Sequence, residues 1–246
     1  MMKKQPIHQK LIFLLFLSLL SHIAKAQFIR LSYGSGVGTY SMKPLKELSR
    51  YSIQNLPFAA KVTDNFPVTM CHEVTLSLSV RRFGIGFSYD YNTTGSRISY
   101  KDYSGQYTDD LSLEAHLPSL FINYITIQYH KLDVEIQARA GFIATNINSN
   151  TLVKIDEEST ENHLYVTSNS WFVNPGVGVV YKPFSIINFG LNAGYLYDFE
   201  GEIKKDNELK FINPESKKTV KTNWSGLRVN ISLMVNIENL FDKNKN

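Results

Sequence analysis

Cysteine is almost absent from this chain of 246 residues, because Cys71 is the only one. A single cysteine cannot form an internal disulfide, so the chain is not a disulfide-stapled domain. The sequence also has no HExxH run and no close pair of histidines, which are the spacings typical of zinc sites. We therefore expect neither a metal nor a cofactor.

Long apolar runs are equally scarce, and the one present lies at the N-terminus. Three lysines precede the apolar stretch 11–23, and Ala24-Lys25-Ala26 follows it with the small residues that a signal peptidase accepts. Residues 1–26 are therefore predicted to be a cleaved signal peptide, with an uncleaved anchor as the alternative. The mean hydropathy of −0.18 argues against a bundle of transmembrane helices. Cys71 is not at the first mature position, which excludes lipoprotein anchoring through it.

An excess of one charge sign is missing as well. The predicted signal peptide takes four of the 26 basic residues and none of the 22 acidic ones, so the mature chain carries equal numbers of both. Without a basic stripe the sequence has no electrostatic footprint for nucleic acid. The segment 34–38, GSGVG, lies within a predicted strand, so it is not a phosphate-binding loop between a strand and a helix.

The dominant pattern that is present is an apolar residue at every second position, which places the apolar side chains of a strand on one face. In 83–91 and 187–199 one face is wholly apolar, and the other holds Gly, Ser, Asn and Asp. Comparable alternation recurs at 28–40, 73–80, 134–142, 170–181 and 226–237. An eighth segment, 117–128, is apolar on both faces, so its register is open.

The connections between these eight segments alternate in length along the chain. Three are short, at 81–82, 130–131 and 182–184, and four are long, at 41–68, 92–110, 149–169 and 200–223. Every long loop therefore falls at one end of the sheet, and every short turn falls at the other end together with both termini. A soluble sandwich has no reason to sort its loops in this way.

The orientation of the apolar face decides between two kinds of barrel. A soluble barrel points it inward, and a membrane barrel points it outward to lipid. Strands of about ten residues rise roughly 33 Å, and at a tilt near 40° they span roughly 25 Å, the height of an outer-membrane apolar band. Aromatic residues gather near strand ends, as in interfacial girdles. We predict an all-β fold, an eight-stranded antiparallel up-and-down transmembrane β-barrel; a secreted soluble ligand-binding barrel is the alternative.

Five segments carry a resemblance to a known group: 26–40, 61–67, 95–105, 174–184 and 225–237. With their order and spacing, the chain resembles the small porin-like outer-membrane β-barrel proteins of the OmpA/OmpX type, especially those of the Bacteroidetes. The resemblance implies a barrel over 27–241 in the outer membrane of a Gram-negative bacterium, with periplasmic termini, four extracellular loops and a short polar tail at 242–246. It also implies contact with outer-membrane lipid, lipopolysaccharide and the insertion machinery. The chain departs from the group in that Phe241, the candidate assembly signal, is followed by five further residues.

Charged residues on the predicted inner face form the first candidate site. They are Arg30, Glu73, Asp90, Glu135, Arg139, Asp198, Arg228 and Glu238. Isolated charges in a narrow lumen are costly, so we expect an ion-pair network that plugs the barrel rather than a solute gate. Arg30 and Glu238 lie at the same end of the first and last strands, and we predict a salt bridge between them.

The long loops form the second candidate site, for an extracellular protein or glycan. In 41–68, Ser41 as cap, Pro44 in the first turn and spaced apolar residues up to Pro57 predict a short helix that covers the barrel mouth, lies on the bilayer or contacts a partner. Loop 92–110 predicts a projecting hairpin with Tyr100, Tyr103 and Tyr107. The charge runs of 149–169 and 200–223 indicate a solvated surface. A further hypothesis is that their lysines contact lipopolysaccharide phosphates.

Catalysis is the remaining alternative, because some eight-stranded outer-membrane barrels are lipid A hydrolases or acyltransferases. A hydroxyl nucleophile needs a base within hydrogen-bond reach and a third group that orients the base. His72 and Glu73 point to opposite faces, whereas His116, Glu114 and Ser112 share one. One such trio is expected by chance in a serine-rich chain. We therefore predict a non-enzymatic protein with a structural or surface-interaction role.

Overall fold

The computed structural model describes residues 28–103, 105–156, 158–205, 209–214 and 216–238. The predicted signal peptide 1–26, Phe241 and the tail 242–246 lie outside the described residues. No helix among the described residues is long and apolar enough to cross a membrane.

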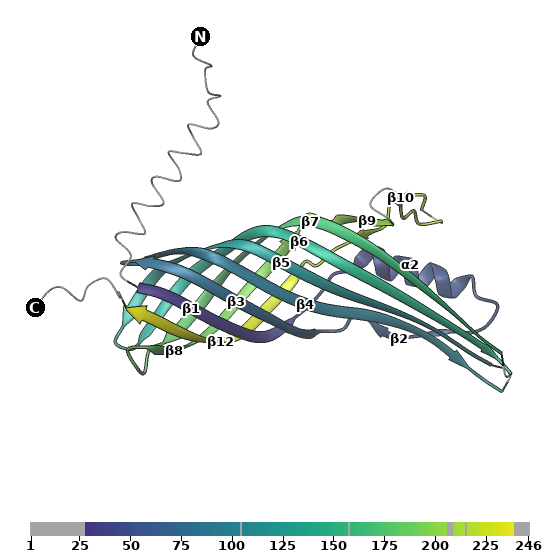
Figure 1. Ribbon diagram of the computed structural model, residues 1–246, viewed down its shortest axis with the longest axis horizontal. Coiled ribbons are helices and arrows are strands. Elements are labelled where there is room, and N and C mark those ends of the chain that lie inside the picture. Colours follow the sequence, from purple (N-terminus) through teal and green to yellow (C-terminus); the bar gives the residue numbers. More distant parts are fainter. Residues whose placement is uncertain (1–27, 104, 157, 206–208, 215, 239–246) are drawn as a thin grey trace, which may run out of the picture.

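Eight antiparallel strands form a closed ring (Figure 1). In ring order they are β1 (Phe28–Gly38), β3 (Thr69–Val80), β4 (Phe83–Lys101), β5 (Gly105–Tyr129), β6 (Leu132–Ile155), β7 (Glu158–Tyr181), β8 (Ile187–Asp198) and β12 (Gly226–Glu238). The ring closes because β12 pairs with both β8 and β1, with Phe28 opposite Glu238. The predicted eight-stranded antiparallel barrel is confirmed.

The short turns all lie at one end of the ring, as predicted. They join β3 to β4, β5 to β6 and β7 to β8, and the first residue of β1 and the last of β12 lie at the same end (Figure 1). Arg81 and His130, in the first two of these turns, have positive φ angles of 55° and 50°. Two-residue connections between antiparallel strands demand such left-handed backbone.

Two of the four predicted long loops consist mostly of strand, and the projecting hairpin predicted in 92–110 is confirmed. Residues 92–101 and 105–110 continue β4 and β5, and most of 149–169 continues β6 and β7, so these strands contain 19, 25, 24 and 24 residues. A strand of 25 residues rises roughly 80 Å, more than twice the length that a membrane band requires. The four strands therefore project far beyond the ring as two long hairpins (Figure 1). We call the projecting residues 92–101, 105–117, 143–155 and 158–170 the extension.

Within the ring, the outer face is apolar and the inner face is polar. Each strand exposes large apolar side chains, which we call the belt; one example per strand is Leu31, Leu76, Phe87, Leu120, Ile136, Val177, Leu191 and Ile231, each 45 to 69% exposed. The inward neighbours are mostly small or amide side chains, such as Ser32, Ser77, Ser88, Asn123, Gln137, Asn174, Asn192 and Asn230, each 8% exposed or less. This arrangement suits lipid outside and polar contacts inside, and it is the opposite of the soluble ligand-binding barrel.

In the extension the two faces exchange polarity. The buried cluster there includes Leu113, Ala115, Leu117, Ile143, Ile147 and Val166, all on the inner face, while Ser112, Asn148 and His163 lie exposed on the outer face. Apolar inside and polar outside is the pattern of a protein domain in water. This exchange also explains why the extension was predicted as loops: its apolar residues occupy the inward positions, whereas those of the belt occupy the outward positions.

A helix lies against the inner face of the extension, and four short strands pair with its edges or with one another. They are α2 (Lys43–Gln54), β2 (Lys61–Asn65), β9 (Gly201–Lys205), β10 (Leu209–Lys210) and β11 (Lys221–Thr222). The predicted helix in 41–68 is confirmed, and Pro44 lies in its first turn. The predicted Ser41 cap is wrong, because Met42 is the N-cap residue, in left-handed backbone and without a side-chain cap. Met42 and Leu45 join the buried cluster around Trp224, so α2 packs under the long hairpins (Figure 1).

The register of 117–128 is now defined. Leu120, Ile122 and Tyr124 are exposed and face outward, whereas Phe121 and Ile125 are at most 5% exposed and face inward. A bulge between Ile125 and Ile127 then shifts the register against β6. The segment is apolar on both faces because Phe121 and Ile125 face the lumen while the belt side chains face outward.

Candidate functional site

The strongest cluster of charges in the lumen is centred on Arg139 of β6. Its guanidinium nitrogens lie 2.8 Å from Glu73 of β3 and 3.0 Å from Asp90 of β4. Glu73 also accepts hydrogen bonds from Thr75, at 3.0 Å, and from the amide of Asn230 on β12, at 2.6 Å. All these side chains are buried, and each carboxylate has partners that compensate its lost hydration. The cluster ties together four strands across the lumen.

A second ion pair lies closer to the short turns. Arg30 of β1 donates to Glu135 of β6 at 3.3 Å, and Asn123 donates to the same carboxylate oxygen at 2.7 Å. In the ring β6 is the fourth strand from β1 in either direction, so this pair bridges opposite walls. The two clusters together place fixed charges and hydrogen bonds across the bore.

Two other predicted lumen residues, Arg228 and Asp198, have different described partners. Arg228 donates to the backbone carbonyls of Thr39 and Trp224 at 2.6 and 2.8 Å, and its guanidinium lies 4.7 Å from the Tyr40 ring centroid. Asp198 accepts from the backbone N–H of Trp224 at 2.8 Å. Both residues therefore fasten the chain where the ring meets the extension.

The predicted Arg30–Glu238 salt bridge stays a prediction. The register places Asn236 opposite Arg30 and Phe28 opposite Glu238. The ion pair that Arg30 forms among the described residues is with Glu135, and the side chain of Glu238 is not among the described parts.

Tyrosine and histidine side chains form a row across β1, β3, β4 and β5. On the outer face, the hydroxyl of Tyr33 lies 2.9 Å from Nδ1 of His72, and that of Tyr89 lies 2.6 Å from Nδ1 of His116. The strand register places His72 beside Tyr91 and Tyr91 beside His116. Amphipathic rings in such a row suit the boundary between lipid and water.

The structure does not assemble a catalytic trio at His116. Ser112 and Glu114 share its outer face, as expected. However, Ser112 is four residues away along β5, roughly 13 Å at the strand rise, whereas proton transfer requires about 3 Å. Nδ1 of His116 is already engaged by Tyr89. The geometry of this trio therefore gives no support to nucleophilic catalysis.

The three tyrosines predicted in hairpin 92–110 lie near its tip. The ring of Phe58, in the segment after α2, lies 4.7 Å from that of Tyr100 and 5.3 Å from that of Tyr107, centroid to centroid. Tyr100 also donates to Asp102 at 2.6 Å, which raises the pKa of Tyr100. Tyr103 is fully exposed. Two of the tyrosines therefore stiffen the hairpin and the third projects into solvent.

The outer face of the extension is a polar surface with a shallow hollow. Arg97 of β4 forms a two-point contact with Asp110 of β5, at 2.5 and 2.9 Å, and this contact raises the pKa of Arg97. Thr63, Asn150 and Glu161, from β2, β6 and β7, line the same hollow. The residues on this face can form hydrogen bonds with a polar partner.

The polarity exchange was missed although the sequence contains a signal for it. In β5 the apolar side chains occupy odd positions over 111–117 and, apart from Phe121, even positions over 118–124, and no bulge intervenes before Ile125. A change of parity without a bulge means that the apolar side chains change face. β7 shows the same change between the extension and the belt.

The sequence matches no protein-family model, and no curated protein is significantly similar to it. Solved structures with a similar chain trace include the outer membrane protein OprG from Pseudomonas aeruginosa, with a TM-score of 0.47, 12% identity and coverage of 87% of this chain and 98% of that one. Ail, the attachment invasion locus protein of Yersinia pestis, has a TM-score of 0.38 and 10% identity over 85% and 99% of the two chains. The outer membrane protein AlkL in DMPC bilayers has a TM-score of 0.40 and 10% identity over 88% and 92%.

Proposed function

We propose that this chain is a non-enzymatic outer-membrane protein of a Gram-negative bacterium that holds a folded platform, the extension, outside the cell. The short turns and both termini lie in the periplasm. One observation carries the proposal: the outer face is apolar around the whole ring, and on β4 to β7 it turns polar where these strands continue into the extension. A change of the apolar side chains from the outer to the inner face matches a boundary between lipid and water.

The lumen is proposed to be plugged rather than conducting. Arg139 with Glu73 and Asp90, and Arg30 with Glu135, place ion pairs across a ring of eight strands, and such a ring encloses little more space than its side chains fill. Planar bilayer recordings test this directly. Steady conductance through the wild-type barrel would contradict the plug.

The platform is proposed to meet an extracellular protein or glycan. The rigid hairpin tip with the exposed Tyr103 and the polar hollow beside Arg97 and Asp110 are the surfaces that support it. Predicted loop segments 41–68, 92–110, 149–169 and 200–223 all lie at this end of the molecule. The lysines of 204–205 and 217–218 are proposed to bind lipopolysaccharide phosphates. The insertion machinery is the proposed partner during assembly.

Labelling of single cysteines in intact cells tests the topology. In a Cys71→Ser background, Tyr103→Cys at the hairpin tip is expected to react with a membrane-impermeant maleimide, and Lys131→Cys at a short turn is expected to react only after the outer membrane is opened. The two sites are both surface positions and differ only in the end of the barrel that they mark. Labelling of Lys131→Cys in intact cells would overturn the proposed orientation.

Fractionation and gel mobility test the barrel itself. The protein is expected to remain with outer membranes and to migrate differently before and after boiling. Release into the soluble fraction without detergent would overturn the membrane location, whatever the loops bind.

A further inference from the structure

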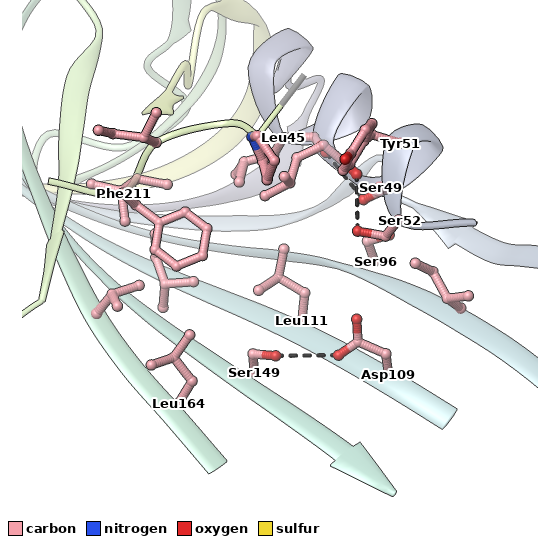
Figure 2. Close-up of a pocket in the computed structure, with 17 residues that line it drawn as sticks. Leu45, Ser49, Tyr51, Ser52, Ser96, Asp109, Leu111, Ser149, Leu164 and Phe211 are labelled. Carbon is pink, nitrogen blue, oxygen red and sulfur yellow. Dashed lines mark hydrogen bonds between the residues drawn. The ribbon is translucent and has the colours of Figure 1, made fainter. Parts of the chain in front are cut away.

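A cavity of about 340 Å³ lies between α2 and the inner face of the extension. In Figure 2, Leu45 and Tyr51 of α2 face Leu111 and Leu164 of the sheet across this space, and Phe211 closes one side. Protein cores leave few voids larger than a water molecule. A cavity of this volume is within the range of small-molecule sites.

The lining of the cavity is mainly apolar, and part of it is only half-buried. Four apolar side chains pack against the buried cluster without being fully buried, namely Leu48, Leu111, Leu164 and Phe211, and all four line the cavity. Their remaining exposed surface faces the same space. An apolar ligand would bury the remaining exposed surface of these four side chains and gain hydrophobic free energy.

One end of the cavity is polar, and Asp109 is the charged residue in its described lining. Both described hydrogen bonds of Asp109, from Ser149 at 3.2 Å and Thr151 at 3.1 Å, reach Oδ1, and the other oxygen faces the cavity in Figure 2. The lining serines already donate within the protein. Ser49 and Ser52 donate to carbonyls of α2 at 3.1 Å, and Ser96 donates to the carbonyl of Asp64 at 3.0 Å.

We propose that this cavity binds a small amphiphile with an apolar body and a cationic or hydrogen-bond-donating head that pairs with Asp109. At the ~30 Å³ that a water-sized group occupies in a liquid, the cavity holds on the order of eleven non-hydrogen atoms. Asp109 offers a free carboxylate oxygen and repels an anionic head. An alkyl amine or alcohol therefore fits, and a carboxylate of the same length does not.

This inference does not depend on the proposed role of the outer surface. The cavity lies on the inner face of the extension, whereas the proposed platform contacts use its outer face and its tip. Binding is measured on purified protein, so the outcome is independent of cell-surface topology or of any macromolecular partner.

Hydrogen exchange with the full-length mature protein in nanodiscs of zwitterionic lipid tests the proposal. The probes are 1-decylamine, 1-decanol and decanoate, each of roughly the size that fills the cavity. Decylamine and decanol are expected to slow exchange in peptides covering α2 and 109–113, but not in the belt peptides covering 118–124. The apparent Kd of decylamine is expected to be on the order of tenfold lower than that of decanoate.

Two variants with matched controls locate the site. Asp109→Asn is expected to abolish the preference for decylamine over decanoate, whereas Asp110→Asn, on the opposite face of the same strand, leaves it unchanged. Leu111→Trp fills the cavity and is expected to abolish protection by all three probes, whereas Leu152→Trp on the outer face does not. Retention of the heat-dependent gel shift shows which variants still form the barrel.

Two results would overturn the proposal. One is equal protection of α2 and belt peptides by all probes, which indicates partition into lipid. The other is binding of decanoate as tight as that of decylamine to the wild-type protein. If Leu111→Trp does not fold, the relative affinities for decylamine and decanoate, measured in the wild-type protein and in Asp109→Asn, still test the proposal.

Discussion

Two halves of a single strand, β5, follow opposite rules. Over 118–129 the outward side chains Leu120, Ile122 and Tyr124 are apolar and exposed, while over 105–117 the inward side chains Leu113 and Leu117 are apolar and fully buried. The backbone pairing with β4 continues through both halves without a shift. The difference teaches that strand pairing sets the geometry and that the surrounding medium sets which face is apolar.

The interiors of the two regions are also stabilised differently. The ring encloses ion pairs and hydrogen bonds between polar side chains, which are costly to bury and must compensate each other. The extension encloses an ordinary apolar core, in which Trp224 is fully buried, its ring lies edge-on 5.2 Å from that of Tyr40, and its Nε1 donates to Thr145 at 2.9 Å. The two regions should therefore respond to different substitutions.

The largest effect is expected in the lumen. Arg139→Met leaves Glu73 and Asp90 buried without their counter-charge, which is expected to cost about 3–5 kcal/mol of unfolding free energy. Arg97→Met, which breaks the exposed pair with Asp110, is expected to cost about 1 kcal/mol or less. Urea unfolding in lipid vesicles, followed by tryptophan fluorescence, measures both. Equal costs would show that the lumen charges are solvated.

The next effect belongs to the core of the extension. Leu113→Ala is expected to destabilise the extension by about 2–5 kcal/mol, because Leu113 is fully buried and its truncation leaves a cavity. The heat-dependent gel shift of the ring is expected to persist, and hydrogen exchange is expected to rise only in the extension. Ser112→Ala, the neighbour on the outer face, is the control. Simultaneous loss of both regions would contradict their independence.

A lysine substitution on the outer face distinguishes the lipid environment of the belt from the aqueous environment of the extension. Leu120→Lys in the belt is expected to cost about 2–4 kcal/mol, because the ammonium enters the apolar band of the bilayer. Ser112→Lys, on the same face of the same strand but in the extension, is expected to change stability by no more than about 0.5 kcal/mol. Unfolding in vesicles measures the pair, and a soluble barrel would give similar values for both.

The smallest effect is a pH dependence at the edge of the extension. Glu202 lies 2.9 Å from Lys210, and this hydrogen bond lowers the pKa of Glu202. Because the pKa of Glu202 is lower in the folded than in the unfolded protein, its carboxylate stabilises the fold at pH values above the unfolded-state pKa. This stabilisation is lost as the pH falls through the folded-state pKa. Exchange in β9 and β10 is therefore expected to rise slightly below about pH 4. Glu202→Gln and Lys210→Gln should each remove this rise, and their double variant should add nothing.

Much of the ring could be predicted from the sequence, because a half-apolar strand alternates every second residue and short turns follow long loops in a strict order. Arg139, Glu73 and Asp90 could be placed on the inner face by parity alone. Their mutual contacts depend on ring curvature, which brings β6 near β3 across the lumen. The extension was predicted only in part, as a projecting hairpin and a helix. Leu113 and Leu164 lie in or beside segments whose polar composition predicts loops.

The sequence by itself determined the number of ring strands, their order and the face of the belt residues outside 117–128, because these follow from periodicity along one strand. Only the tertiary structure decided where the apolar face changes side, which charges meet across the ring, and that α2 leaves a cavity beside Asp109. These features depend on distances between strands that are far apart in the chain, and periodicity within a strand carries no record of them.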